Sequence, residues 1–203
     1  MACWFNLYNK IEIMKKYILQ SIRLTVVLII LLCVAYPLFV SLAGGFSKGK
    51  GNGEKVMHNG KVVGYALLGQ SFTKPEYFWG RPSAVDYNAA GSAGSNKGPS
   101  NADYLAVVQG RVDTLLKYNP SLKKTDIPAD MVTASGSGLD PDISEAGAII
   151  QIKRVAAYRN LDEKMVAKLV VENTQGPWLG MFGPSKINVL ALNIALDDLK
   201  NIK

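Results

Sequence analysis

The chain has 203 residues, of which 48% are hydrophobic and 19% charged, a composition typical of folded proteins and not of disordered ones. The formal net charge of +7 divides into a net +3 in residues 1–47 and a scattered net +4 in the remainder, which argues against a nucleic-acid partner. The cysteines are Cys3 and Cys33, so residues 48–203 can form no disulfide, thiolate metal site or cysteine nucleophile.

An uncharged apolar run near the N-terminus predicts a membrane anchor. Residues 24–47 carry no charge, and we expect a transmembrane helix over residues 24–43, since membrane helices tolerate a proline such as Pro37. The alternative is a cleavable signal peptide ending at Ser41-Leu42-Ala43, but its apolar region would exceed the roughly 7–15 residues usual for such peptides.

The charges before this run predict its orientation. Basic residues on the short N-terminal flank favour a cytoplasmic segment 1–23 and an extracytoplasmic domain, in the cell (inner) membrane. These residues are Lys10, Lys15, Lys16 and Arg23. Residues 1–13 read as an extension from an upstream start codon, with Met14 as the alternative start.

The outer domain begins after a glycine-rich linker over residues 44–53. Residues 56–63 predict a β-hairpin with Asn59-Gly60 in a type I′ turn, and the second strand is expected to continue to about Phe72. An aromatic and proline-rich stretch follows over residues 74–82. Residues 88–101 then form a long loop of small residues, which is typical of functional or mobile segments.

The second half of the chain predicts helices. Ser100 should cap a helix over residues 101–118, and residues 130–141 should be a strand end followed by a Gly/Ser loop. Further helices should begin near Ser144, at Leu161-Asp162 and after Ser185. The predicted core positions on these helices are Leu105, Val108, Val112, Leu115, Leu116, Ile149, Ile152, Val155, Met165, Val166, Leu169, Val170, Ile187, Leu190, Ile194 and Leu199. We therefore expect an α+β protein: one transmembrane helix and a mixed, helix-dominated domain over residues 54–203 with a small sheet.

Two apparent catalytic motifs fail on their context. Gly45-Phe46-Ser47-Lys48-Gly49 matches G-x-S-x-G, but it lies in the linker, and His58 at a hairpin turn is the one histidine of the sequence. Residues 44–50 match G-x-x-x-x-G-K, but Gly51 stands where a P-loop has Ser or Thr. We predict neither a hydrolase nor an ATPase site, and no catalytic residue.

Polar residues of the outer domain leave several interpretations open. Asp140 and Asp142 could bind a hard cation through their carboxylates. More often such residues cap the next helix and place negative charge at its N-terminus, so no metal site is predicted. A loop of hydroxyls and amides could hold an anion or phosphate, or could be a turn. It consists of Thr133, Ser135, Gly136, Ser137 and Gly138. Arg81 could reach a partner's carboxylate or form an internal ion pair.

Longer motifs connect the chain to a known family. They are residues 77–84 (YFWGRPSA) with 87–96, residues 128–141 (PADMVTASGSGLDP), residues 151–161 around Gln151 and Arg154, and residues 188–197 around Asn193. Over about residues 14–203 the sequence resembles the C subunit of the Kdp potassium-transporting P-type ATPase, the KdpC family.

The resemblance implies a non-catalytic subunit, with ATP and potassium handled by the complex. Its partners would be a channel-like potassium-binding subunit, the ATP-hydrolysing subunit and a small stabilising peptide, besides membrane lipid. The family is described as needed for assembly and as promoting ATP binding, although an extracytoplasmic domain could not touch cytoplasmic ATP directly.

We expect instead that the domain covers the external potassium entrance. The contact candidates are Arg81, Asp86, Tyr87, Asn88, Ser135, Ser137 and Asp140. The alternative is a free-standing, membrane-anchored protein that binds an extracytoplasmic solute.

Overall fold

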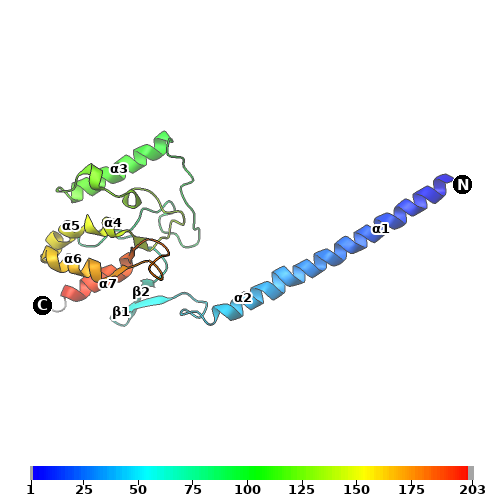
Figure 1. The fold of residues 1–203 in the computed structure, drawn as a ribbon, viewed down its shortest axis with the longest axis horizontal. Helices are drawn as coiled ribbons and strands as arrows, with labels where there is room; N and C mark the ends of the chain where they lie inside the picture. The colour runs from blue at the N-terminus through cyan, green and yellow to red at the C-terminus, as the bar shows by residue number, and fades with distance from the viewer. Residues whose placement is uncertain (1, 201–203) are drawn as a thin grey trace. The chain divides into compact units, whose positions relative to one another are not determined.

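The computed structural model describes the backbone of residues 2–200 and the side chains of residues 14–199. The chain forms two units, Met1–Gly53 and Glu54–Lys203 (Figure 1). Two parts of the predictions fall outside the described residues: Met1, the first of the two possible start residues, and residues 201–203 of the predicted domain.

The N-terminal unit is an extended helix in three parts. These are α1 (Ala2–Ile29), a π-helical segment η1 (Ile30–Ala35) and α2 (Tyr36–Gly44). Within it, Met14–Gly44 contains an 18-residue stretch with a mean hydropathy of 2.8, and it is the one helix among the described residues that is long and apolar enough to cross a membrane. The predicted apolar helix is thereby confirmed.

The π-helical segment has a physical cause. Pro37 has no N–H to donate and its ring would clash with the carbonyl of Cys33, four residues earlier in an α-helix. A wider turn over Ile30–Ala35 relieves that clash without breaking the helix.

The outer unit begins with the predicted hairpin. Strands β1 (Lys55–His58) and β2 (Lys61–Tyr65) pair antiparallel, and Asn59 (φ 50°) and Gly60 (φ 75°) have the positive φ angles of a type I′ turn. The expected continuation to Phe72 is wrong: Ala66 N still donates to Glu54 O at 2.9 Å beside β1, but the chain then turns to other segments. Ala66 accepts a hydrogen bond from Asn188 Nδ2 at 2.8 Å, and Gly69 N donates to Leu139 O at 2.8 Å.

A second small sheet joins distant parts of the chain. Strands β3 (Asp142–Ile143), β4 (Thr174–Gln175) and β5 (Lys186–Asn188) lie in the order β3-β5-β4, all antiparallel. Ile187, in the central strand, is fully buried.

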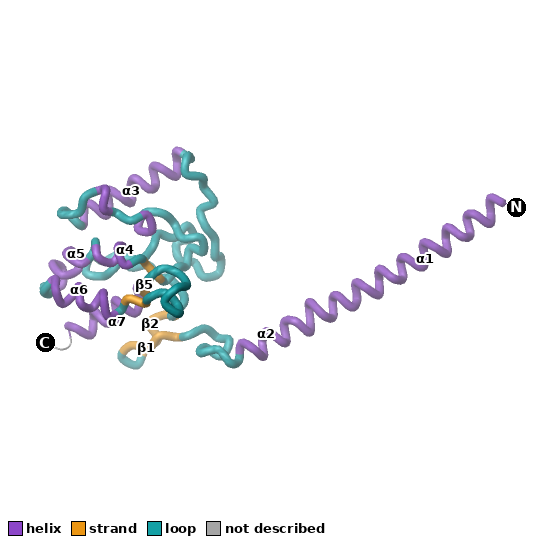
Figure 2. Tube along the Cα trace, viewed as in Figure 1, coloured by secondary structure: helices purple, strands orange, loops and turns teal. Residues whose placement is uncertain are grey.

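The helices of this unit are α3 (Ala102–Tyr118), α4 (Glu145–Ile149), α5 (Ile152–Arg159), α6 (Glu163–Glu172) and α7 (Val189–Lys200). Short 3₁₀ turns occupy η2 (Lys124–Asp126) and η3 (Ala129–Met131), so the strand end expected at residue 130 is wrong. With the two small sheets, these elements confirm the α+β class and the dominance of helices (Figure 2).

Helix boundaries differ from the prediction where tertiary bonds compete. Ser144 caps α4 as expected, accepting from Gly147 N at 2.9 Å, but the helix after it divides into α4 and α5. Asn101, not Ser100, caps α3. Ser185 does not cap α7, because residues 186–188 pair with β3 and β4; Asn188 accepts from Ala191 N at 3.0 Å instead.

The hydrophobic core gathers side chains from helices α3 to α7, from strands β3 and β5, and from segments without regular secondary structure. Val112, Leu115, Val155, Val166, Leu169 and Val170 are buried as predicted, whereas Leu105, Ile149 and Met165 are exposed. The largest core side chain from such a segment is that of Phe78, which is fully buried. The core therefore depends on a segment that has no regular secondary structure.

Replacing Phe78 by Ala should reduce the free energy of unfolding by about 3–5 kcal/mol, because a large buried side chain leaves a cavity. The measurement is denaturant unfolding of the full chain in detergent, followed by tryptophan fluorescence. Leu67→Ala, at an exposed position, is the control and should change stability by no more than about 0.5 kcal/mol. Equal losses in both variants would contradict the central position of Phe78.

Candidate functional site

The aromatic stretch 74–82 is held in place by side-chain amides that act as a substitute for a neighbouring strand. Asn193 on α7 accepts from Phe78 N at 2.9 Å and donates to Phe78 O at 3.0 Å. Gln151 accepts from Trp79 N at 2.8 Å and donates to Trp79 O at 3.2 Å. Both amide side chains are buried, so they satisfy backbone groups that water cannot reach.

Two arginines complete this support. Arg154 is buried and donates to the carbonyls of Pro75 and Tyr77, and its guanidinium lies 4.2 Å from the centre of the Trp79 ring. Burial lowers the pKa of Arg154 to about 10, so it is still charged at neutral pH. Arg159 donates to Glu76 O at 2.8 Å and pairs with Asp197 at 2.7 Å.

The structure brings together the two loops that carry the predicted contact residues. Arg81 Nη1 lies 2.9 Å from Asp140 Oδ2. Of the two alternatives for Arg81, a partner's carboxylate or an internal ion pair, the structure therefore has the internal ion pair. Ser83 Oγ donates to Gly138 O at 2.6 Å, and Ser135 N donates to Pro82 O at 3.1 Å. Residues 81–96 and 133–140 therefore form one surface, which we call the two-loop surface.

Glycine at position 138 is required by this packing. Its φ is +68°, and a Cβ there would lie 2.6 Å from Val85 Cγ2 and 2.8 Å from Ala93 O. A side chain at 138 would thus push the two loops apart.

The hydroxyls of the Ser/Gly loop make local bonds. Ser135 Oγ accepts from Gly138 N at 2.9 Å, Ser137 Oγ accepts from Leu139 N at 3.1 Å, and Thr133 Oγ1 donates to Ala129 O at 2.7 Å. Ser135 is buried, whereas Gly136 and Ser137 are exposed. Anion binding by this loop stays a prediction.

The apex of the other loop has unusual backbone geometry. Asp86 and Tyr87 have φ angles of 51° and 58°, which L-residues adopt at some cost. Tyr87 is held by bonds from its hydroxyl to Arg81 O at 2.6 Å and from its N–H to Ser83 Oγ at 2.9 Å. Burial raises the pKa of the Tyr87 hydroxyl, and the charge of Arg111 offsets part of that rise. Asp86 and Asn88 are left exposed on a fixed loop.

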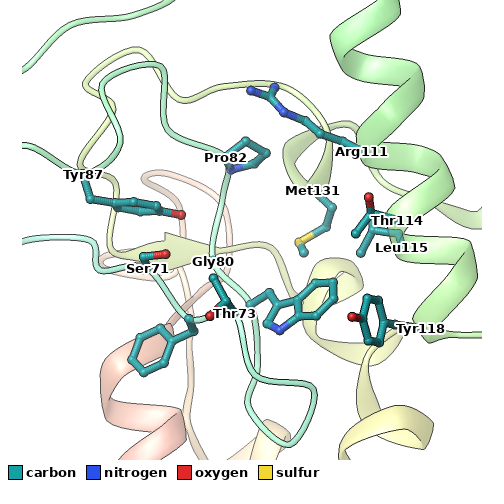
Figure 3. Close-up of a pocket in the computed structure, with 12 residues that line it drawn as sticks. Ser71, Thr73, Gly80, Pro82, Tyr87, Arg111, Thr114, Leu115, Tyr118 and Met131 are labelled. Atoms are coloured by element: carbon teal, nitrogen blue, oxygen red, sulfur yellow. The ribbon is translucent and has the colours of Figure 1, made fainter.

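Beside Tyr87 lies an aromatic cleft of about 380 Å³ that the sequence did not predict (Figure 3). Figure 3 shows Tyr87 and Tyr118 on its two sides and Arg111 above them. Trp79 packs edge-on against Tyr118 at 5.2 Å between ring centres. The walls of the cleft come from residues 71–87, α3 and η3. No local sequence pattern marks segments so far apart, and the aromatic run at 77–79 was the available signal.

The carboxylates considered for metal binding are paired with cations. Asp140 contacts Arg81, and Asp142 Oδ2 lies 2.6 Å from Lys186 Nζ. Among the residues that the structure describes, no group of three or more His, Cys, Asp or Glu side chains could hold a metal ion.

Comparisons with known proteins agree on one family. The family model described as K+-transporting ATPase, c chain (KdpC) matches residues 18–198. The chain is 58% identical over 185 residues to the potassium-transporting ATPase KdpC subunit of Flavobacterium johnsoniae, covering 91% of this chain and 100% of the relative. It is 56% identical over 185 residues to that of Flavobacterium psychrophilum (91% and 100%) and 50% identical over 192 residues to that of Bacteroides fragilis strain YCH46 (92% and 99%).

Gln151→Leu should lower the free energy of unfolding by about 2 kcal/mol, because it leaves the partly buried N–H and C=O of Trp79 without these partners. Chemical denaturation of the full chain in detergent measures this loss. Gln109→Leu is the matched control, since Gln109 makes its hydrogen bonds with Asp113 and Lys124 on the exposed surface. A Gln151→Leu variant as stable as the control would show that the amide is dispensable.

Proposed function

The chain belongs to the KdpC family, the c chain of the K+-transporting ATPase, and from this premise we propose that its outer domain covers the external potassium entrance of that complex. Family membership makes the chain a non-catalytic accessory subunit with other Kdp subunits as partners. In the proposed role it supports assembly and couples potassium entry to ATP hydrolysis by the catalytic subunit.

The orientation that this role needs is supported by charge. Lys15, Lys16 and Arg23 lie in the N-terminal part of the apolar helix Met14–Gly44. Basic residues on a short flank favour the cytoplasmic side, which leaves residues 54–203 outside the cytoplasm. In this arrangement the domain lies on the side from which potassium enters.

The observation that carries the proposal is the two-loop surface. Loops 59 residues apart in sequence are locked together by the Arg81–Asp140 pair, and backbone bonds reinforce it. A docking surface gains affinity when its loops are ordered before binding, because less conformational entropy is lost. Asp86, Asn88 and Ser137 project from this ordered frame as the partner contacts.

Promotion of ATP binding fits an indirect mechanism better than direct contact. ATP is cytoplasmic and the proposed domain is not, so any effect would pass through the other subunits. The hydroxyls of Ser135 and Ser137 already accept hydrogen bonds from the loop itself. We therefore favour coupling through subunit contacts over nucleotide binding by the Ser/Gly loop.

The aromatic cleft favours a second candidate function. A hollow of about 380 Å³ with Trp79, Tyr118 and Arg111 in its walls has the size and chemistry of a small-ligand site. This would suit a free-standing, anchored solute-binding protein.

Affinity purification separates the two functions. A C-terminally tagged chain is purified from gently solubilised membranes of potassium-starved cells. Recovery of a P-type ATPase and a polytopic partner in fixed ratio supports the subunit role, and recovery of the chain alone with a bound solute supports the other.

Asp86→Lys should raise the potassium concentration for half-maximal ATP hydrolysis by the purified complex about tenfold, which corresponds to ~1.4 kcal/mol. The change reverses a charge on the exposed loop apex, where Lys can adopt the positive φ angle, as Lys50 does. Asp126→Lys makes the same charge change on the exposed η2 turn and should leave the potassium dependence unaltered. Unchanged assembly and potassium dependence in Asp86→Lys would remove this loop from the interface.

A further inference from the structure

A second exposed feature of the outer domain is strongly apolar. The apolar loop, residues 177–184, connects β4 to β5 and appears beside β5 in Figure 2. Its sequence is PWLGMFGP, and residues 173–185 contain no charged side chain. Four large hydrophobic side chains of this loop are exposed to solvent: Trp178 (71%), Leu179 (69%), Met181 (76%) and Phe182 (57%).

The exposure does not come from an unstructured chain. Trp178 N donates to Phe182 O at 2.8 Å and Phe182 N donates to Trp178 O at 2.9 Å, which makes the loop a narrow hairpin. The two rings lie 5.8 Å apart, and Gly180 and Gly183 supply the positive φ angles of 73° and 85°. At its base, β4 and β5 pair through the fully buried Ile187. The hydrophobic side chains are thus held outward by an ordered backbone.

Such a loop is suited to a protein interface. Clustered exposed apolar side chains mark interaction sites, and the cores of interfaces are enriched in Trp, Phe and Met and depleted of charge. Ordering before binding also reduces the entropy lost on docking. These properties point to a partner with an uncharged hydrophobic groove.

The loop also adjoins the proposed two-loop surface. One cleft of about 500 Å³ has Arg81 and Asp140 in one wall and Pro184, Ser185 and Lys186 in the other. A partner that contacts Arg81 and Asp140 can therefore reach the base of the apolar loop without leaving the same face.

We infer that the apolar loop inserts into an uncharged hydrophobic groove on the extracytoplasmic side of another subunit of the K+-transporting ATPase. This inference rests on the proposed function. Lipid is the less suitable occupant, because segments that bind anionic membrane surfaces combine apolar side chains with Lys or Arg. Residues 173–185 contain neither Lys nor Arg. Lys186, next in sequence, is paired with Asp142 at 2.6 Å.

Site-specific photocrosslinking in the assembled complex tests the inference. A photoreactive amino acid is placed at Leu179, and at Val171 on α6 as a matched control, since the two side chains are 69% and 68% exposed. We expect a crosslink from position 179 to another Kdp subunit and none from position 171. An active complex in which position 179 reacts only with lipid, only with a second copy of this chain or not at all would overturn the inference and leave the proposed function intact.

Substitution gives an independent readout. Trp178→Ser combined with Phe182→Ser should reduce recovery of the other subunits at least tenfold, while Val171→Ser should not. Because these side chains are exposed, the far-UV circular dichroism and the thermal unfolding of the variant chain should match those of the unchanged chain. Full recovery with the double variant would also overturn the inference. If the unchanged chain recovers no Kdp subunit at all, the proposed function fails and this inference falls with it.

Discussion

The backbone of residues 75–79, buried at Phe78 and partly buried on either side of it, is the constraint on which the outer domain depends. This segment forms neither helix nor strand, yet Phe78 within it is fully buried at the centre of the core. Each of its peptide groups would be costly without a hydrogen-bond partner. The chain satisfies them with side chains from α5, from Gln151 directly before it and from α7: the amides of Gln151 and Asn193 and the guanidiniums of Arg154 and Arg159.

That solution also determines where the exposed surfaces lie. Once Phe78 is fixed in the core, Trp79 must stand beside Tyr118 in the wall of the aromatic cleft. Arg81, two residues further on, then reaches Asp140, and its carbonyl accepts from the Tyr87 hydroxyl. The loop that carries Asp86 and Asn88 is therefore ordered by bonds that trace back to the core. Exposed polar residues on such a frame present the same arrangement to each partner molecule.

Sequence reasoning succeeded where the determinants are local. The Asn59-Gly60 turn, the Ser144 cap and the apolar helix before residue 44 each follow from a few adjacent residues, and the long family motifs identified the family. It failed where the partner is distant. Residues 186–188 became a strand because they pair with β3 and β4, and Gln151 supports Trp79 across 72 positions of sequence. The aromatic cleft needs three separate segments, so no periodicity could predict it.

The short segment Asp140-Pro141-Asp142 joins the two exposed surfaces mechanically. Asp140 pairs with Arg81 of the two-loop surface, and Asp142 pairs with Lys186 beside the apolar loop. Between them, Pro141 accepts a hydrogen bond from Val189 N at 2.9 Å, at the start of α7. Proline also restricts the backbone here, so the two carboxylates cannot move independently over any large distance. A partner bound at one surface therefore contacts a segment that also supports the other surface. Helix α7, which begins at Val189, also carries Asn193, the residue that accepts a hydrogen bond from the buried Phe78 N. The two exposed surfaces and the buried core around Phe78 are thus connected through these ion pairs and hydrogen bonds and through α7.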